Sequence, residues 1–244
     1  MSTYLFQETP RRGPWSGQEP EPGEERAPTH EPMFNAPWPA IALAVVIVVG
    51  YAIQSRLSDL WLEPLVFSPA ALGQGRWWTL FSHLFLHGNW AHALSNAAFV
   101  VVFGTPAARF FGTRGWGVVL FFAFYLICGA LAALGFAAVH PGGTEAMIGA
   151  SGAASGLVGV SARVVAGKGR LGPIFAPFVL AMGAAWLIVN LITAGVMALG
   201  ANGLIPGTGG AGVAWEAHLA GFLAGVLLIS PFAWLLRRIA GRGR

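Results

Sequence analysis

The stretch Ala146–Val160, AMIGASGAASGLVGV, contains two serines and four glycines and has no charged residue. Small residues of this kind let helices approach each other closely inside a membrane. Close approach would also allow a second helix to bring a base to one of the two hydroxyl groups, those of Ser151 and Ser155. The stretch therefore predicts a packed membrane helix, and it raises the question of whether one serine is a nucleophile.

The whole chain shares the apolar character of this stretch. Of its 244 residues, 55% are hydrophobic and 10% are charged, whereas soluble domains carry about 25% charged residues. The composition therefore predicts an integral membrane protein. The single cysteine, Cys128, excludes an internal disulfide, and its apolar neighbours favour a packing role.

Six apolar runs follow a polar start. Residues 1–36 are rich in Pro and Glu and predict a disordered tail, and residues 37–240 are expected to form the membrane domain. A helix needs about 20 residues to cross the hydrocarbon, and the shorter runs can borrow flanking residues. We therefore expect an all-α fold of six transmembrane helices. The runs are Trp38–Ile53, Trp90–Phe103, Trp116–Val139, Ile148–Ala166, Ile174–Leu199 and Val213–Leu236.

Lys and Arg residues predict the orientation. With the tail in the cytoplasm, twelve of the fourteen fall on the inner side, and Arg56 and Arg76 remain outside. Six spans then place both termini in the cytoplasm. Because the basic residues are scattered between apolar runs, the net charge of +4 indicates topology and not a nucleic-acid surface. The Ala, Gly and Arg usage and the short loops favour a bacterial inner membrane, with lipid around the bundle.

The long first connection, residues 54–89, is rich in Trp, Phe and Leu but is interrupted by Pro and Gly. Exposed irregular backbone is not tolerated within hydrocarbon, so we expect this segment to lie in the outer interface. Its tryptophans are interpreted as interface anchors. The glycine-rich segment from Gly200 to Gly212, GANGLIPGTGGAG, is expected to be a mobile cap over the same side.

Polar side chains within the spans are functional candidates, because burying them in lipid costs several kcal/mol. Four of them, from three helices that run in the same direction, are expected to share one depth: His92, Asn96, Ser151 and His218. A serine becomes a nucleophile when an imidazole takes its proton, and an oxyanion needs fixed donors. We expect Ser151 and His218 to form a dyad, with His92 and Asn96 facing the oxyanion. The other polar candidates are Ser95, Ser155, Ser161, Asn190 and Thr193.

Two further patterns bear on this site. Gly221 and Gly225 form a GxxxG arrangement directly after His218, which favours close packing of the fourth and sixth spans. His83, His87 and His92 could instead suggest a metal site. The chain has no HExxH motif and no nearby cysteine or Asp partner, so we predict no metal and no cofactor, and we interpret His83 and His87 as structural.

These motifs resemble those of the rhomboid intramembrane serine proteases. The resemblance is carried by GASG at Gly149–Gly152, by AHLAGFLAG at Ala217–Gly225 and by HLFLHGNWAHALSN at His83–Asn96. It implies that Ser151 is the nucleophile and His218 the base, and that the Ser151 backbone N–H joins His92 and Asn96 in holding the oxyanion.

Three positions depart from the family pattern. Ser155 stands where an aromatic ring usually stacks on the catalytic histidine. Trp78-Thr79 replaces a frequent Trp-Arg pair, and Ala108 replaces a common glutamate.

The resemblance implies an endopeptidase that cleaves single-pass transmembrane proteins near the outer membrane face, after a small residue. Two alternatives stay open. A catalytically silent relative would bind transmembrane helices and control their folding or degradation. A solute transporter is disfavoured, because the spans contain no paired charges and no broken-helix repeat. No sequence feature indicates an oligomeric state.

Overall fold

A computed structural model describes residues 35–200 and 212–241 of the chain. Within these ranges the backbone forms helices joined by loops, and the only β pairing is two isolated bridges. The predicted all-α class is confirmed. The predicted tail, apart from its last two residues, and the predicted cap, apart from its two ends, lie outside the described residues.

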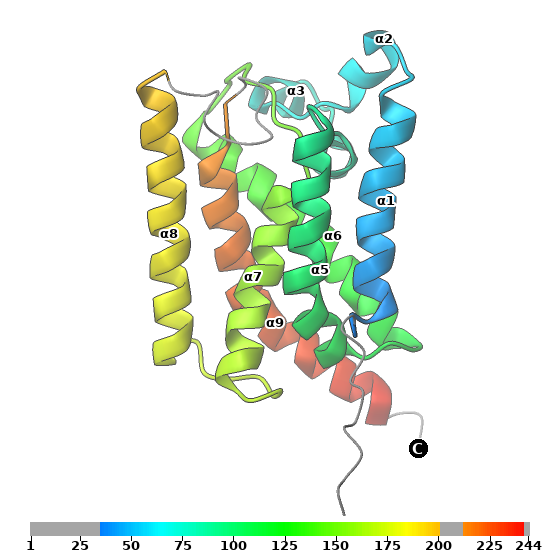
Figure 1. Ribbon diagram of the computed structural model, residues 1–244, viewed down its shortest axis with the longest axis vertical. Helices are drawn as coiled ribbons and strands as arrows, with labels where there is room; N and C mark the ends of the chain where they lie inside the picture. Colours follow the sequence, from blue (N-terminus) through cyan, green and yellow to red (C-terminus); the bar gives the residue numbers. More distant parts are fainter. Residues whose placement is uncertain (1–34, 201–211, 242–244) are drawn as a thin grey trace, which may run out of the picture. The chain divides into compact units, whose positions relative to one another are not determined.

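Six long helices form the bundle (Figure 1). Four of them are long and apolar enough to cross a membrane, whereas α1 and α7 have 17 and 16 residues. The protein is therefore an all-α, multi-pass membrane protein, and the count of six spans stays a prediction. The six helices are α1 (Trp38–Gln54), α5 (Trp90–Phe111), α6 (Trp116–Val139), α7 (Ser151–Ala166), α8 (Pro177–Ala198) and α9 (Trp215–Gly241).

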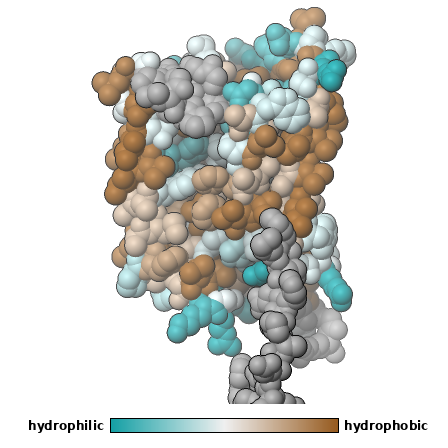
Figure 2. All heavy atoms as spheres, in the orientation of Figure 1, coloured by the Kyte–Doolittle hydropathy of each residue, from teal (hydrophilic) through white to brown (hydrophobic). Residues whose placement is uncertain are grey.

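The surface agrees with a membrane setting. Figure 2 shows a broad band of hydrophobic residues across the middle of the drawn face, with hydrophilic residues gathered toward its two ends. Many large apolar side chains of α1 and α8 are exposed, including Val45 and Ile192. Such an apolar surface would be unfavourable in water and is favourable in contact with lipid chains.

The first connection consists of five short helical segments at the end of the bundle where α7 begins, which we call the Ser151 end. Two contacts join this connection to the segment that leads into α7. Phe67 and Met147 form an antiparallel bridge, and the N–H of Gly149 donates to the carbonyl oxygen of His83 at 2.9 Å. Trp61 is 72% exposed, consistent with the expected interfacial role. The segments are α2 (Asp59–Leu62), η1 (Glu63–Leu65), α3 (Pro69–Gly73), α4 (Thr79–Ser82) and η2 (His83–Phe85).

Helix α7 is the centre of the bundle. Every residue from Gly152 to Val164 is buried, and α5, α6, α8 and α9 all contact this helix. Burial on all sides explains why its sequence is so rich in small residues. Cys128 of α6 packs here as predicted: it is buried, and a Cβ added to Gly156 would lie 2.6 Å from the Cys128 Cβ.

The predicted close approach of α7 and α9 is confirmed. A Cβ added to Gly221 would overlap the carbonyl oxygen of Gly152, and a Cβ added to Gly225 would overlap that of Gly156. Here the missing side chains let the two backbones touch. Because His218 lies one turn before Gly221 on α9, this contact sets the distance from His218 to the start of α7.

Arg163, in the last turn of α7, links this helix to the middle of α9. Its side chain is buried, and its guanidinium nitrogens donate to the carbonyl oxygens of Gly172 and Val226 and to the hydroxyl of Ser230, at 2.7 to 3.0 Å. A buried cation is tolerated when its donors are satisfied. The residue was predicted as part of the inner positive charge, and the structure adds this bracing role.

Replacing Gly225 with Ala is expected to destabilise the protein by about 1–3 kcal/mol, because the added methyl group forces α7 and α9 apart. The measurement is the thermal unfolding midpoint in detergent. The matched control is Gly195→Ala in α8, where a Cβ meets nothing within 4 Å. The control should unfold at or slightly above the midpoint of the parent, since Ala favours a helix over Gly and the added methyl group meets no neighbour. Equal midpoints for the two variants would contradict the tight α7–α9 contact.

Candidate active site

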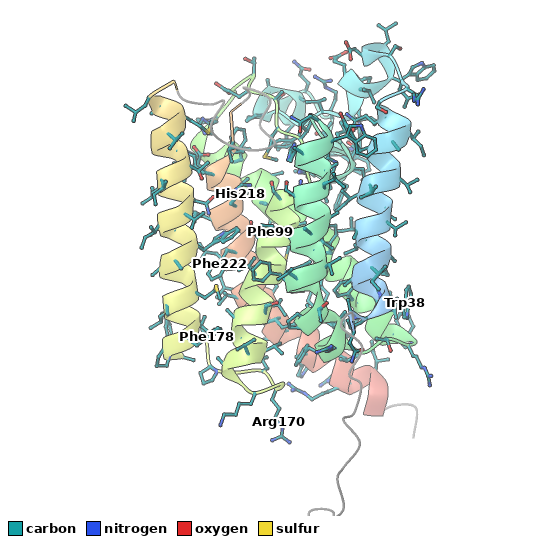
Figure 3. The ribbon with its side chains drawn as sticks, in the orientation of Figure 1. Trp38, Phe99, Arg170, Phe178, His218 and Phe222 are labelled. Atoms are coloured by element: carbon teal, nitrogen blue, oxygen red, sulfur yellow. The ribbon has the colours of Figure 1, made fainter. Side chains whose placement is uncertain are left out.

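Ser151 and His218 meet between the two most closely packed helices. Ser151 is the first residue of α7. His218 lies in the first turn of α9 (Figure 3). The Nε2 atom of His218 lies 2.8 Å from the Ser151 Oγ atom. This is the geometry in which an imidazole can take the hydroxyl proton. The structure therefore brings together the two residues that the sequence paired.

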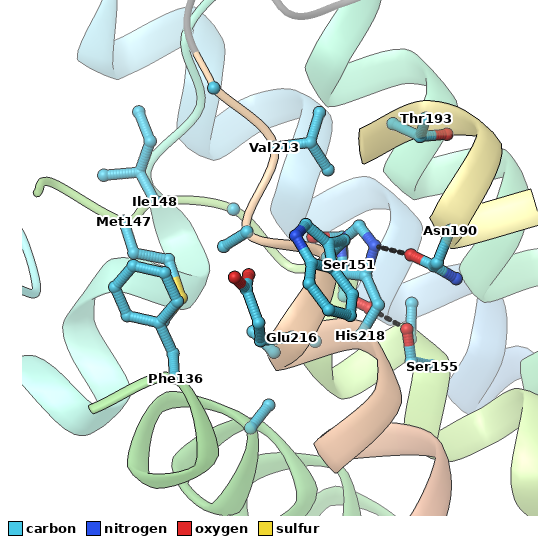
Figure 4. A pocket seen from close by; sticks show the side chains of 18 of the residues that line it. Phe136, Met147, Ile148, Ser151, Ser155, Asn190, Thr193, Val213, Glu216 and His218 are labelled. Carbon is cyan, nitrogen blue, oxygen red and sulfur yellow. Dashed lines mark hydrogen bonds between the residues drawn. The ribbon is translucent and has the colours of Figure 1, made fainter. Parts of the chain in front are cut away.

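The other ring nitrogen of His218 also has a partner. Its Nδ1 atom lies 2.8 Å from the Oδ1 atom of Asn190 in α8 (Figure 4). The Trp186 ring of the same helix lies 6.4 Å from the imidazole, centroid to centroid. Sequence reasoning noted Asn190 as a polar residue in an apolar span but assigned it no place in the site. Its isolation in the fifth apolar run was the signal that could have found it.

His92 and Asn96 lie beside the backbone that leads into Ser151. A Cβ added to Gly149 would lie 2.7 Å from the His92 Nε2 atom and 3.5 Å from the Asn96 Nδ2 atom. The φ angle of Gly149 is +117°, a conformation that side chains rarely adopt. Glycine is therefore required two residues before Ser151, both by this angle and by the approach of the two side chains.

Both side chains present a donor at this place. The N–H of Gly88 points at the His92 Nδ1 atom at 3.4 Å, so the ring proton of neutral His92 belongs on Nε2. The Nδ2 atom of Asn96 is buried and has no hydrogen-bond partner among the described residues. Asn89 caps α5 by accepting the His92 backbone N–H at 2.8 Å, which fixes where this helix starts.

The start of α7 adds backbone donors. The first N–H groups of a helix have no partner within the helix, and the helix dipole makes this end electropositive. Ser151 is at this end, and no side chain caps it in the structure. A negative oxygen next to Ser151 would therefore face backbone N–H groups together with the His92 and Asn96 side chains.

A cavity of about 740 Å³ opens over the Ser151–His218 pair. Its walls include apolar side chains such as Phe136, Met147 and Val213, and the labelled close-up shows them around the pair (Figure 4). The cavity can hold a peptide segment beside the serine. His140 and Glu216 also line it and lie 3.1 Å apart, Nε2 to Oε1.

His83 and His87 are buried supports behind the site. The His83 Nδ1 atom lies 2.7 Å from the Thr79 carbonyl oxygen, whereas both His87 ring nitrogens lack a hydrogen-bond partner among the described residues. Gln54 holds the His87 backbone at both its N–H and its carbonyl oxygen. Burial lowers the pKa of each histidine to about 4. His83 and His87 are thus neutral in the folded chain. His83 makes the structural hydrogen bond that was expected, whereas the His87 ring makes none among the described residues.

The remaining polar candidates bond locally or brace neighbouring helices. The hydroxyls of Ser95, Ser155 and Thr193 each donate to a carbonyl oxygen of their own helix, and Ser161 donates to Phe103 of α5 at 2.6 Å. Ser155 therefore does not bond to His218. Within the described ranges there is no cluster of three His, Cys, Asp or Glu side chains able to hold a metal ion.

The other two departures from the family pattern have plain local structures. Thr79 is buried, and its hydroxyl donates to the Arg76 carbonyl oxygen at 2.6 Å. The Arg76 guanidinium lies 3.7 Å from Glu63. Ala108 is fully buried in the core, where it packs among apolar neighbours.

Comparison with known proteins identifies a family. A family model described as Rhomboid domain matches residues 74–235, which is about two thirds of the chain and includes all four predicted site residues. None of the curated proteins matches the chain.

Stability in detergent is expected to fall between pH 6.5 and pH 4. The unfolded chain binds protons on His83 and His87 near pH 6.5, whereas the folded chain binds them only near pH 4. Stability from these groups is therefore present above pH 6.5 and lost as the pH falls, by roughly 3 kcal/mol for each histidine. The measurement is the unfolding midpoint against pH for the parent and for His83→Asn with His87→Asn. If the parent loses no more stability than the double variant over this range, the assignment is wrong.

Proposed function

The chain belongs to the rhomboid family, and we propose that it is an intramembrane serine endopeptidase that cleaves transmembrane proteins near the outer membrane face. The observation that carries the proposal is the 2.8 Å contact between His218 Nε2 and Ser151 Oγ inside an apolar helix bundle. A serine and a histidine placed in this way at the floor of a cavity suit acyl transfer.

The reaction follows from these positions. Ser151 Oγ attacks the scissile carbonyl carbon while His218 Nε2 takes the hydroxyl proton. The protonated imidazole then gives that proton to the leaving amine, and the new N-terminus departs. Water, activated by the same imidazole, hydrolyses the acyl-enzyme and releases the new carboxyl end. No step needs a metal or a cofactor.

The tetrahedral intermediate carries its negative charge on the former carbonyl oxygen. The donors nearest to this place are the His92 Nε2–H, the Asn96 amide and the N–H groups at the start of α7. Removing a single donor of this kind typically costs about 10²–10³ in kcat. The Asn96 Nδ2 atom is buried and lacks a hydrogen-bond partner among the described residues, which supports this role, since such a donor is costly and is retained where a function needs it.

The substrates we propose are single-pass transmembrane proteins. A helix hides its carbonyl groups in its own hydrogen bonds, so a substrate segment must unwind before it enters the cavity. Entry requires a movable wall, and α8 is the best candidate: only Val179 and Asn190 of its 22 residues are buried. We further propose a bacterial inner membrane with both termini in the cytoplasm.

A catalytically silent protein that holds transmembrane helices is the competing function. It would also need a cavity between helices, but it would not need a serine hydroxyl bonded to an imidazole next to free donors. The two functions differ in one measurable property, which is the reactivity of Ser151 toward an electrophile.

Ser151→Ala and His218→Ala are expected to abolish both fluorophosphonate labelling in detergent and cleavage of single-pass substrates in proteoliposomes, because each removes one partner of the proton transfer. The matched control is Ser161→Ala on the same helix, whose hydroxyl only bonds to Phe103. The control should label like the parent. A parent protein that folds but neither labels nor cleaves any of a panel of single-pass substrates would favour the silent alternative.

Asn96→Ala is expected to lower kcat by about 10²-fold with little change in KM, because the lost donor acts on the oxyanion and not on the bound substrate. The control is Ser95→Ala at the neighbouring position, since the Ser95 hydroxyl bonds only to the His92 carbonyl oxygen of its own helix. Initial cleavage rates in proteoliposomes at several substrate densities separate the two constants. A rise in KM at unchanged kcat would remove Asn96 from the oxyanion site.

A further inference from the structure

We propose that Asn190 is a positioning residue that holds His218 in the one ring tautomer able to activate Ser151. The inference rests on the proposed function and adds a third residue, from α8, to the predicted dyad. It starts from the 2.8 Å contact between Asn190 Oδ1 and His218 Nδ1. Asn190 touches no reacting atom, so its effect passes entirely through His218.

The orientation of the Asn190 amide is determined by its second partner. The Nδ2 atom donates to the Trp186 carbonyl oxygen, one turn earlier in α8, at 2.8 Å. A carbonyl oxygen can only accept, so the amide nitrogen must face Trp186. The amide oxygen is thereby turned toward His218.

The oriented amide fixes the proton on the imidazole. Because Oδ1 can only accept, His218 must carry its proton on Nδ1. The lone pair of Nε2 then faces the Ser151 hydroxyl at 2.8 Å, ready to accept its proton. The other tautomer would set two lone pairs against each other at Nδ1, and its Nε2–H could not act as the base.

The same bond serves the charged intermediate. When Nε2 takes the proton from Ser151, the imidazolium still donates through Nδ1 to the amide oxygen. A hydrogen bond to a charged donor is stronger than one to a neutral donor. The hydrogen bond between Asn190 and His218 therefore becomes stronger while the tetrahedral intermediate forms, and Asn190 itself does not change protonation.

The packing of α8 points to a specific role for this asparagine. Val179 and Asn190 are the only buried residues of α8, which is otherwise apolar and largely exposed, and Asn190 is 3% exposed. A polar side chain in such a place is unfavourable unless its partner compensates for the lost water. The neighbouring side chain, Leu191, is 49% exposed, so a side chain at that position is not enclosed beside a partner.

The role of Asn190 also explains how His218 is oriented when position 155 is a serine. No ring from α7 can stack on His218 there, because Ser155 is small and bonds to the Ser151 carbonyl oxygen. The contacts that orient His218 come from α8 instead, through the Asn190 amide and the Trp186 ring. Displacing α8 would therefore release His218 from its tautomer, and catalysis would require α8 to return once the substrate is seated.

The test uses three variants of the full chain in proteoliposomes. Asn190→Leu keeps the branched shape but removes the acceptor. Asn190→Asp, as the neutral acid, keeps an acceptor for His218 and a donor for the Trp186 carbonyl oxygen. Leu191→Ala is the control on the exposed face. We expect Asn190→Leu to lower kcat by about 10- to 100-fold with KM nearly unchanged, which is the loss of one hydrogen bond to a charged group. Asn190→Asp should recover most of the rate, and Leu191→Ala should match the parent.

The direct readout is the ¹⁵N spectrum of the imidazoles in membranes, with the His218 signals identified by their loss in His218→Gln. The parent should show a proton on Nδ1 of His218, and Asn190→Leu should show a mixture of tautomers. A parent spectrum with the proton on Nε2 overturns the proposal even if no variant folds. So does an unchanged kcat in folded Asn190→Leu. Failure of the proposed function is distinct, since it would appear as a folded parent that neither labels nor cleaves, or as cleavage that survives Ser151→Ala.

Discussion

The backbone contact between α7 and α9 is the constraint on which the rest of the structure depends. Gly221 and Gly225 face the carbonyl oxygens of Gly152 and Gly156 with no room for a Cβ atom. Lipid offers no hydrophobic driving force for helix association, so the attraction between helices must come from close packing. The same contact brings the first turn of α9 to the first residue of α7. The proposed nucleophile and its base are therefore neighbours because the two backbones touch.

The polar side chains of the long helices fall into two groups. The hydroxyls of Ser95 and Thr193 donate to carbonyl oxygens of their own helices, so they do not connect one helix to another. The groups that reach another helix or loop lie at functional or bracing points. Arg163 ties α7 to α9 at one end, and Asn190 ties α8 to His218 at the other. Each such bond offsets the cost of removing a polar group from water, so it also determines which helix positions are stable.

Rigidity and looseness are divided between helices. Ser151 begins α7, which is buried from Gly152 to Val164, whereas α8 buries two residues. A rigid helix keeps Ser151 at a constant distance from the proposed oxyanion donors, as preorganised catalysis requires. A loosely packed helix can move to admit a substrate, but it also carries the side chain that orients His218. In the proposed mechanism, access and catalytic readiness are thus coupled through one hydrogen bond.

Much of this protein was determined by its sequence alone. Apolar runs and scarce charges predicted the helices, and the spaced motifs around Ser151, His92 and His218 predicted which side chains would meet. The length of the apolar runs and the composition predict the helices because every backbone group in lipid must bond within its own helix.

Tertiary structure alone decided the partners of those side chains. Asn190 was visible as an isolated polar residue, yet nothing in its neighbours along the chain shows which helix it faces. Its bond to His218 joins positions 28 residues apart, and it depends on how α8 is rotated against α9. The bracing role of Arg163 was hidden for the same reason. A local pattern fixes the face of a helix on which a residue lies, but only the packing of helices decides what that face meets.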